Sequence, residues 1–285
     1  MKLKLTQRIA IGYYKTKIKT IGLLSKRKAA EKAFQLFCTP YSGKPNRKAP
    51  AVFHHAEKLT VQLDELTIRG WQWHSNHSNG KRVLIVHGFD SCSYKFDKYI
   101  KQLTHEGYTV LAFDAPGHGI SDGKIANALM LKNTILEIAK KYGSLYAIMA
   151  HSMGGIAAAL AVEELTDVQK LILIAPATET QRAVDNFFKF VPLGNAIKEE
   201  LLEYIVELGQ KPLSYFSVAR SVQEHSIPTL WLHDEDDWIC PYEDVLPVKK
   251  ITPPHVQFYI TKGLGHSRIY RDTKVNKQII DFINQ

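Results

Sequence analysis

The sequence predicts an α/β fold in which a mostly parallel central sheet of about eight strands is flanked by helices. Short apolar runs recur along the chain, and Val83–Val86 is continuous in the way expected of a strand buried on both faces of a sheet. Helix-length segments separate most of these runs, as in right-handed parallel strand–helix–strand units. The 285 residues suffice for one large domain with a buried core.

The strands and helices can be placed by their apolar patterns. Residues 59–63 and 66–73 alternate apolar and polar side chains around a turn at Asp64–Glu65, which predicts an antiparallel pair. The remaining strands are predicted at residues 83–86, 108–113, 145–149, 171–174, 228–232 and 256–260. Helices are predicted at residues 125–140, 156–165 and 273–283.

One long interval interrupts this alternation. Between Pro176 and Ile227 the sequence contains no strand pattern, and a helix is predicted near residues 197–208. Connections of this length are uncommon inside a compact domain and are usually functional. We therefore predict a helical cap insertion at about residues 178–222, over the open end of the sheet.

The positive charge of the chain is concentrated at one end. Residues 1–48 contain 13 Lys or Arg and one acid, Glu31, for a net charge of +12, whereas the other residues contain 24 basic and 27 acidic side chains. We therefore predict a basic helical extension and linker at 1–48, and one domain at 49–285 that contains the cap insertion. Since the larger part is nearly neutral, no nucleic-acid partner is expected.

The first 37 residues predict one or two amphipathic helices, because they lack proline and place apolar residues at helical spacing. These helices either dock on the hydrophobic body with their lysines in water, or lie on an anionic membrane surface. No apolar run is long enough to span a membrane, and no secretory signal pattern is present. Both interpretations stay open at this stage.

The three cysteines, Cys38, Cys92 and Cys240, are too few and too scattered for a disulfide framework or a zinc site. This usage fits a reducing compartment, so a cytoplasmic location is expected, and buried structural thiols are the favoured interpretation. The sequence shows no metal-binding cluster, phosphate loop or dinucleotide motif, so no cofactor and no metal are expected.

A candidate nucleophile lies at the centre of the chain. Ser152 follows a predicted buried strand and precedes a predicted helix, and the small residues Ala150, Gly154 and Gly155 surround it. A serine at such a corner is lifted out of the sheet, and small neighbours allow strand and helix to approach closely. The helix N-terminus behind it offers unpaired N–H groups and a positive dipole.

Four further motifs accompany this corner, and together the five follow one another along the chain. They are His87–Asp90, Asp114–Gly119, Ala150–Gly155, His233–Pro241 and Gly263–His266. In this order they resemble the motifs of α/β hydrolases of the serine esterase and monoacylglycerol-lipase type. The resemblance implies an α/β-hydrolase fold with a helical cap, and Ser152 excludes the relatives that use an aspartate nucleophile.

The resemblance also implies a catalytic triad. Ser152 needs a base to remove its proton, and His266 is the histidine that follows the last predicted strand, where α/β hydrolases place theirs. The acid of these families lies four residues after the histidine of its loop and four before the proline, which indicates Asp237. Asp236 is the second candidate for the acid.

Two backbone N–H groups are expected to stabilise the oxyanion of the reaction. By resemblance they belong to Met153, directly after the nucleophile, and to Phe89, in the loop after the strand at 83–86. His87 and Gly88 are expected to shape that loop. His118 is expected to have a similar supporting role.

The favoured function is a serine hydrolase that cleaves a small-molecule carboxylic ester or thioester through an acyl-serine intermediate. Alternatives are a C–C bond hydrolase or a peptidase with the same triad, a non-catalytic ligand-binding protein on a hydrolase fold, and a peripheral lipid hydrolase that contacts the membrane through residues 1–37. Four apolar residues of the cap either line an acyl pocket or pack the cap onto the body, and both interpretations stay open. These are Phe187, Phe188, Phe190 and Leu193.

Overall fold

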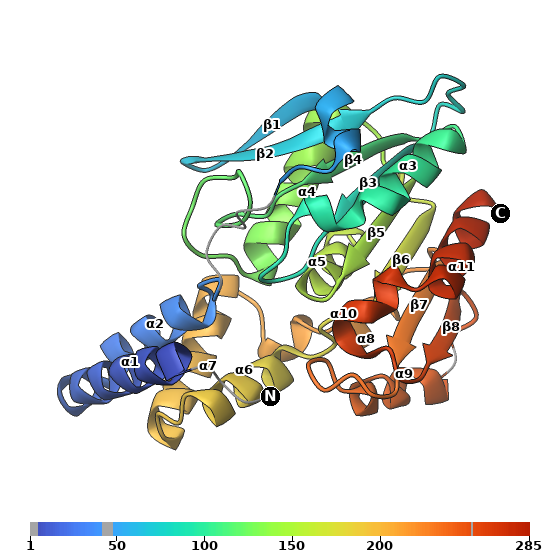
Figure 1. The fold of residues 1–285 in the computed structure, drawn as a ribbon. Coiled ribbons are helices and arrows are strands. Elements are labelled where there is room, and N and C mark those ends of the chain that lie inside the picture. The colour runs from blue at the N-terminus through green and yellow to red at the C-terminus, as the bar shows by residue number, and fades with distance from the viewer. Residues whose placement is uncertain (1–4, 42–47, 252) are drawn as a thin grey trace. The chain divides into compact units, whose positions relative to one another are not determined.

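The chain forms two compact units, one of helices and one built on a sheet (Figure 1). The computed structural model describes residues 5–41, 48–251 and 253–285. The helical unit combines residues up to Thr39 with Glu179–Phe216, and the sheet unit combines Pro40–Thr178 with Ser217–Gln285. The predicted extension and the predicted cap therefore contribute to the same unit.

An eight-stranded sheet forms the centre of the sheet unit and confirms the predicted fold class. The strands are β1 (Glu57–Leu63), β2 (Leu66–Trp73), β3 (Arg82–Val86), β4 (Thr109–Phe113), β5 (Ala147–His151), β6 (Lys170–Ile174), β7 (Thr229–Asp234) and β8 (Val256–Thr261). Their order across the sheet is β1-β2-β4-β3-β5-β6-β7-β8. The β1–β2 and β2–β4 pairs are antiparallel, and all other neighbouring pairs are parallel.

The parallel strands bring distant parts of the sequence to one edge. Because β3, β5, β7 and β8 run in the same direction, the loops at their carboxyl ends share one edge of the sheet. Ligands of open α/β sheets bind at this edge. The loops that meet there contain the motifs singled out in the sequence.

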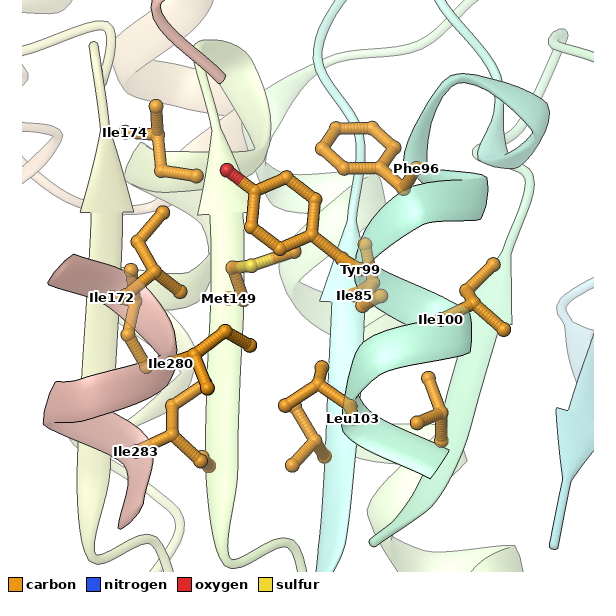
Figure 2. Packing of buried hydrophobic residues seen from close by; sticks show 14 of the residues in the cluster. Ile85, Phe96, Tyr99, Ile100, Leu103, Met149, Ile172, Ile174, Ile280 and Ile283 are labelled. Atoms are coloured by element: carbon orange, nitrogen blue, oxygen red, sulfur yellow. The ribbon is translucent and has the colours of Figure 1, made fainter. Parts of the chain in front are cut away.

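One face of the sheet packs against helices α3 (Asp97–His105) and α11 (Thr273–Asn284). Successive strand residues point to opposite faces. Ile85, Met149 and Ile172 therefore lie on the face that meets Leu103 of α3 and Ile280 of α11, and Figure 2 shows these side chains interleaved. All are buried, so this layer forms the larger hydrophobic core of the unit.

The other face is covered by α4 (Ala128–Tyr142) and α5 (Met153–Ala161). α5 follows Ser152 directly, and almost all of its residues are buried because alanines and glycines allow it to lie close to β5 and β6. The strand residues that alternate with the first core layer, such as Leu84 and Leu173, are also fully buried. The remaining short helices of this unit are α8 (Val218–Ser221), α9 (Leu246–Ile251) and α10 (Gly265–Arg268).

Some element boundaries differ from the prediction for local reasons. The helix expected at 125–140 begins at Ala128, since the Asn127 side chain caps it by accepting a hydrogen bond from the Met130 N–H. The strand expected at 145–149 runs to His151, and the helix expected at 156–165 begins at Met153. The corner at Ser152 is therefore tighter than the apolar pattern alone indicates.

The helical unit consists of α1 (Leu5–Leu24), α2 (Lys26–Phe37), α6 (Thr180–Phe190) and α7 (Asn195–Gly209). The sequence pattern missed α6. Ser25 separates α1 from α2 and caps α2 through a hydrogen bond from the Lys28 N–H. Within the described residues, no helix is long and apolar enough to cross a membrane.

The N-terminal helices pack on the cap helix α7. Ala29, Ala30 and Ala33 form the fully buried face of α2, and small side chains allow two helices to approach closely. Charge reinforces this packing, because Arg27 of α2 forms ion pairs with Glu200 and Glu207 of α7. The docking partner of the extension inside this unit is thus the cap.

We expect Ala33→Leu to overpack the α2–α7 contact. The added side chain should lower the opening free energy of α7 amides by about 1–3 kcal/mol, measured by hydrogen exchange. The control Gln35→Leu adds the same side chain at an exposed position of α2 and should change it by less than about 0.5 kcal/mol. Equal effects of the two substitutions would show that α2 does not pack tightly in the unit.

Candidate active site

Ser152 occupies a strained turn between β5 and α5. Its backbone has φ 57° and ψ −123°, a conformation that side chains other than glycine rarely adopt. Three hydrogen bonds hold the turn: the Ser152 N–H donates to the Ile174 carbonyl at 3.1 Å, and its carbonyl accepts from Gly155 at 2.8 Å and Ala177 at 3.0 Å. The serine is therefore fixed by the strand beside it and by the loop after β6.

Glycines bring the neighbouring backbone against this turn. A Cβ atom on Gly88 would lie 2.6 Å from the Ser152 Cβ, and one on Gly154 would lie 2.7 Å from the His87 carbonyl oxygen. A Cβ on Gly155 would lie 2.6 Å from the Pro176 Cβ. No side chain fits at such distances, so the loops after β3 and β6 can approach this turn because these positions are glycine.

Ser152, His266 and Asp237 are brought together in one hydrogen-bonded chain. The Ser152 Oγ lies 2.9 Å from the His266 Nε2, and the His266 Nδ1 lies 2.8 Å from the Asp237 Oδ2. All three residues are buried. Since a carboxylate can only accept, the His266 Nδ1 donates to Asp237, and its Nε2 is left to accept the serine proton.

The two acidic candidates have different partners. Asp237 accepts the His266 proton through Oδ2, while its Oδ1 accepts the N–H groups of Ile239 and Cys240 at 2.9 Å each. Asp236 instead accepts the Gly263 N–H at 2.9 Å. The geometry therefore places Asp237, and not Asp236, against the imidazole.

The acids of this loop other than Asp237 and Asp236 are expected from the sequence to be solvated charges, but Asp234 is fully buried and anchors the loop that contains His266. Its carboxylate accepts hydrogen bonds from the Thr261 hydroxyl at 2.7 Å, the Leu264 N–H at 3.0 Å and the Gly265 N–H at 2.8 Å. Burial alone would raise the pKa of Asp234, but these hydrogen bonds outweigh burial and lower it. The available signal was an acid two residues after the strand predicted at 228–232.

His87 orients the predicted oxyanion loop. Its Nε2 accepts the Ala115 N–H at 2.9 Å, so its Nδ1 carries the proton and donates to the Gly88 carbonyl at 2.7 Å. Because the C=O and N–H of a trans peptide point in opposite directions, the Phe89 N–H points away from His87. Burial and the nearby His118 lower the pKa of His87 to about 4, which keeps it neutral.

The neighbouring groups complete this arrangement. The His118 Nε2 accepts the Asp90 N–H at 3.0 Å, and the Phe89 ring packs edge-on to His118 at 5.5 Å. Met153 is the first residue of α5, so its N–H has no partner within the helix. Phe89 and Met153 thus offer the two donors that the sequence predicted, and their role in binding an oxyanion stays a prediction.

His151 is a second histidine beside the base that the sequence analysis did not assign. Its Nε2 donates to the His266 carbonyl at 3.0 Å, and its ring centroid lies 4.7 Å from that of His266 and 4.7 Å from that of Tyr270. Burial, with a contribution from His266, lowers its pKa well below the usual value. His151 therefore supports the backbone of His266 as a neutral group.

Cys240 is also closer to the serine than its sequence position suggests. Its buried thiol lies beside the Ser152 hydroxyl and the Asp237 carboxylate. Burial and the charge of Asp237 raise its pKa well above the usual value, so the sulfur stays protonated. This agrees with the interpretation of Cys240 as an inert structural thiol.

The predicted acyl-pocket residues lie in the helical unit. Phe187 and Leu193 are buried, and the Phe187 ring packs against Phe37 at 5.4 Å and Phe188 at 5.5 Å. Phe190 is exposed. Phe187 thus takes part in the packing of its own unit, and an acyl pocket formed by these residues stays a prediction.

No group of three or more His, Cys, Asp or Glu side chains within the described ranges could hold a metal ion. The site is therefore built from a serine, an imidazole, a carboxylate and backbone N–H groups. This set can activate a hydroxyl nucleophile and stabilise negative charge on an oxygen atom.

Known proteins share this fold. A family model described as "Serine aminopeptidase, S33" matches residues 77–212. A Mycoplasma pneumoniae protein whose name places it among the esterases and lipases is 21% identical over 73% of this chain and 90% of its own. An esterase of Pyrococcus furiosus, 19% identical, superposes with a TM-score of 0.65 over 87% of this chain and 96% of its own. An α/β hydrolase of a Penicillium species, 18% identical, superposes with a TM-score of 0.60 over 80% of this chain and 98% of its own.

We expect the asparagine substitutions of Asp237 and Asp236 to have very different effects on turnover. Asp237→Asn should lower kcat for an ester substrate by about 10⁴-fold, because an amide cannot hold His266 in the required tautomer. Asp236→Asn removes the same charge one residue away and should change kcat by less than about threefold. Near-normal turnover by Asp237→Asn with loss in Asp236→Asn would reverse the assignment.

The low pKa of His87 predicts that the folded protein loses stability in acid. The pKa falls from 6.5 to about 4 on folding, so between these values the unfolded chain binds more protons than the folded one. The free energy of unfolding that the neutral His87 contributes is fully present above pH 6.5. It is lost as the pH falls towards 4, by up to about 3 kcal/mol. Urea unfolding at several pH values should show a shallower loss in His87→Asn than in wild type. The exposed control His77→Asn should keep the wild-type slope, and identical slopes for all three proteins would refute the role of His87.

Proposed function

We propose that this chain, which belongs to the α/β-hydrolase superfamily, is a serine hydrolase that cleaves carboxylic ester bonds through an acyl-serine intermediate. The observation that carries the proposal is the hydrogen-bonded chain of Ser152, His266 and Asp237, with distances of 2.9 and 2.8 Å. It lies at the strained turn where the nucleophile of this superfamily resides.

In the first half of the reaction, the Ser152 Oγ attacks the carbonyl carbon of the ester while its proton moves to the His266 Nε2. Asp237 stabilises the resulting imidazolium through the hydrogen bond to Nδ1. The carbonyl oxygen becomes negatively charged and is bound by the N–H groups of Met153 and Phe89. The C–O bond to the alcohol then breaks, and His266 gives its proton to the departing oxygen.

In the second half, water attacks the acyl-serine and gives a proton to His266. The tetrahedral species collapses, the bond between the acyl carbon and Ser152 Oγ breaks, and the proton returns to the serine. A carboxylic acid leaves, and the enzyme is restored. The same steps cleave a thioester, in which a thiol replaces the alcohol.

Small or medium acyl esters are the proposed substrates. The names of the similar M. pneumoniae and P. furiosus proteins refer to esterases, which supports ester over amide cleavage. A peptidase is the second candidate, because the matching family model is described as a serine aminopeptidase. Both reactions use the same triad and differ in the leaving group.

The proposal predicts covalent labelling of Ser152 by a fluorophosphonate probe. Wild type should be labelled and should hydrolyse nitrophenyl esters, with an acyl chain length of fastest turnover that reports the pocket. Ser152→Ala should lose the label and lower kcat by at least about 10⁴-fold, because the nucleophile is removed.

Two results would contradict the proposal. Folded wild type that takes up no label would favour a non-catalytic binding protein on this fold. Turnover of amino-acid nitroanilides that exceeds turnover of the corresponding esters would favour the peptidase. The control Ser144→Ala changes a serine of the same unit whose hydroxyl donates to Asp167 at 2.8 Å, and it should leave labelling intact.

A further inference from the structure

Helix α1 has one face that is occupied within the helical unit. Ile18 is 1% exposed, and a Cβ on Gly22 would lie 3.1 Å from the Ile197 side chain of α7. With 3.6 residues per turn, Ile18 and Gly22 lie on the same side of the helix. This side of α1 faces Ala29 of α2 and Ile197 of α7.

The opposite side of α1 is apolar and exposed. Its residues follow one another at intervals of four and three, so they form one stripe along the helix. We name this the outer stripe, and it consists of Ile9, Tyr13, Thr16, Thr20 and Leu23, with Leu24 beside it. Ile9, Tyr13, Leu23 and Leu24 are 64%, 59%, 86% and 92% exposed. Since one apolar face of α1 already packs inside the helical unit, the exposed apolar face can bind a partner.

Lysines border the outer stripe on both sides. Lys17 and Lys19 lie about 100° from Ile18 in opposite directions around the helix, and both are exposed. The Lys17 ammonium also lies 5.7 Å from the Tyr13 ring centroid. No acidic residue occurs in α1. The exposed side therefore combines an uncharged apolar centre with positive charge at its two borders.

We propose that the outer stripe and its two lysines are a docking surface for an anionic lipid bilayer. A helix lying in the interface inserts its apolar side chains between lipids, and lysines at its borders reach the phosphate groups. Tyrosine is favoured at the same depth. A second copy of this chain fits less well, because the lysines of two facing α1 helices would repel each other.

The position of this surface has a consequence for the helical unit. α1 and α2 pack with α6 and α7, so a bilayer bound to α1 would hold the cap helices at the membrane as well. Removal of the N-terminal helices would uncover the apolar side chain of Ile197 in α7, which lies against Gly22 and is buried. Point substitutions in the full chain are therefore the appropriate test.

The test is co-sedimentation of the full chain with vesicles, in a Ser152→Ala background so that binding does not depend on catalysis. With α1 unchanged, the chain should bind vesicles that contain phosphatidylserine roughly 25-fold more tightly than pure phosphatidylcholine vesicles, because each of the two lysines contributes about fivefold. Lys17→Gln with Lys19→Gln should remove most of this difference. Leu23→Gln with Leu24→Gln should weaken binding to both vesicle types by at least about tenfold.

The matched control is Lys98→Gln with Lys101→Gln, which removes the same charge from exposed positions of α3. It should bind as the Ser152→Ala parent does. Equal binding by the control and the α1 variants would overturn the proposal. The proposal would also be overturned if the chain formed dimers in the absence of lipid and if Leu23→Gln with Leu24→Gln abolished these dimers. The outer stripe would then be a binding surface for a second copy of the chain. Fluorophosphonate labelling of the same variants with Ser152 restored reports the proposed catalytic function separately.

Discussion

The backbone conformation of Ser152 is the constraint on which the site depends. A non-glycine residue at φ 57° and ψ −123° costs about 1–3 kcal/mol and persists where its surroundings hold it. Here β6 and the loop after it hold the turn through hydrogen bonds at Ser152, while Gly88 allows the loop after β3 to touch the serine. The same turn that directs the hydroxyl towards His266 also frees the first N–H of α5. One strained residue thus sets the place of the proposed nucleophile and of one proposed oxyanion donor.

Around this turn, neutral histidines have a structural purpose. His87 fixes the peptide whose N–H belongs to Phe89, and His151 supports the backbone of His266. Burial lowers the pKa of both, so each keeps one nitrogen as a donor and the other unprotonated. A cation at either position would place a second positive charge near the imidazolium that forms in the proposed reaction. In the proposed reaction, His266 alone of these three histidines exchanges protons, while His87 and His151 position the groups around it.

The order of the five motifs along the chain predicted more of the structure than the local apolar patterns did. The parallel sheet could be predicted from the strand and helix pattern. The meeting of Ser152, Asp237 and His266 could be predicted because the motifs resemble those of α/β hydrolases and because strand ends of a parallel sheet share one edge. The pairing of α2 with α7 could not be predicted, because it depends on which apolar helix faces pack together. These faces are about 170 residues apart in the sequence, as the Arg27–Glu200 contact illustrates. The role of His151 was missed for a similar reason, because its partner carbonyl lies 115 residues away. The start of α4 was missed because a single cap, Asn127, outweighs the apolar spacing before it.

The most direct test of the central claim is to identify the residue that becomes acylated. Wild-type protein mixed with a nitrophenyl ester, quenched in acid during the first turnover and digested, should give a peptide acylated on Ser152 by mass spectrometry, because deacylation requires a further attack by water. The buried Cys240 thiol, which lies beside the serine, should carry no acyl group. Acylation of another residue, or rapid ester hydrolysis with no acylated peptide at any quench time, would contradict the assignment of Ser152 as the nucleophile.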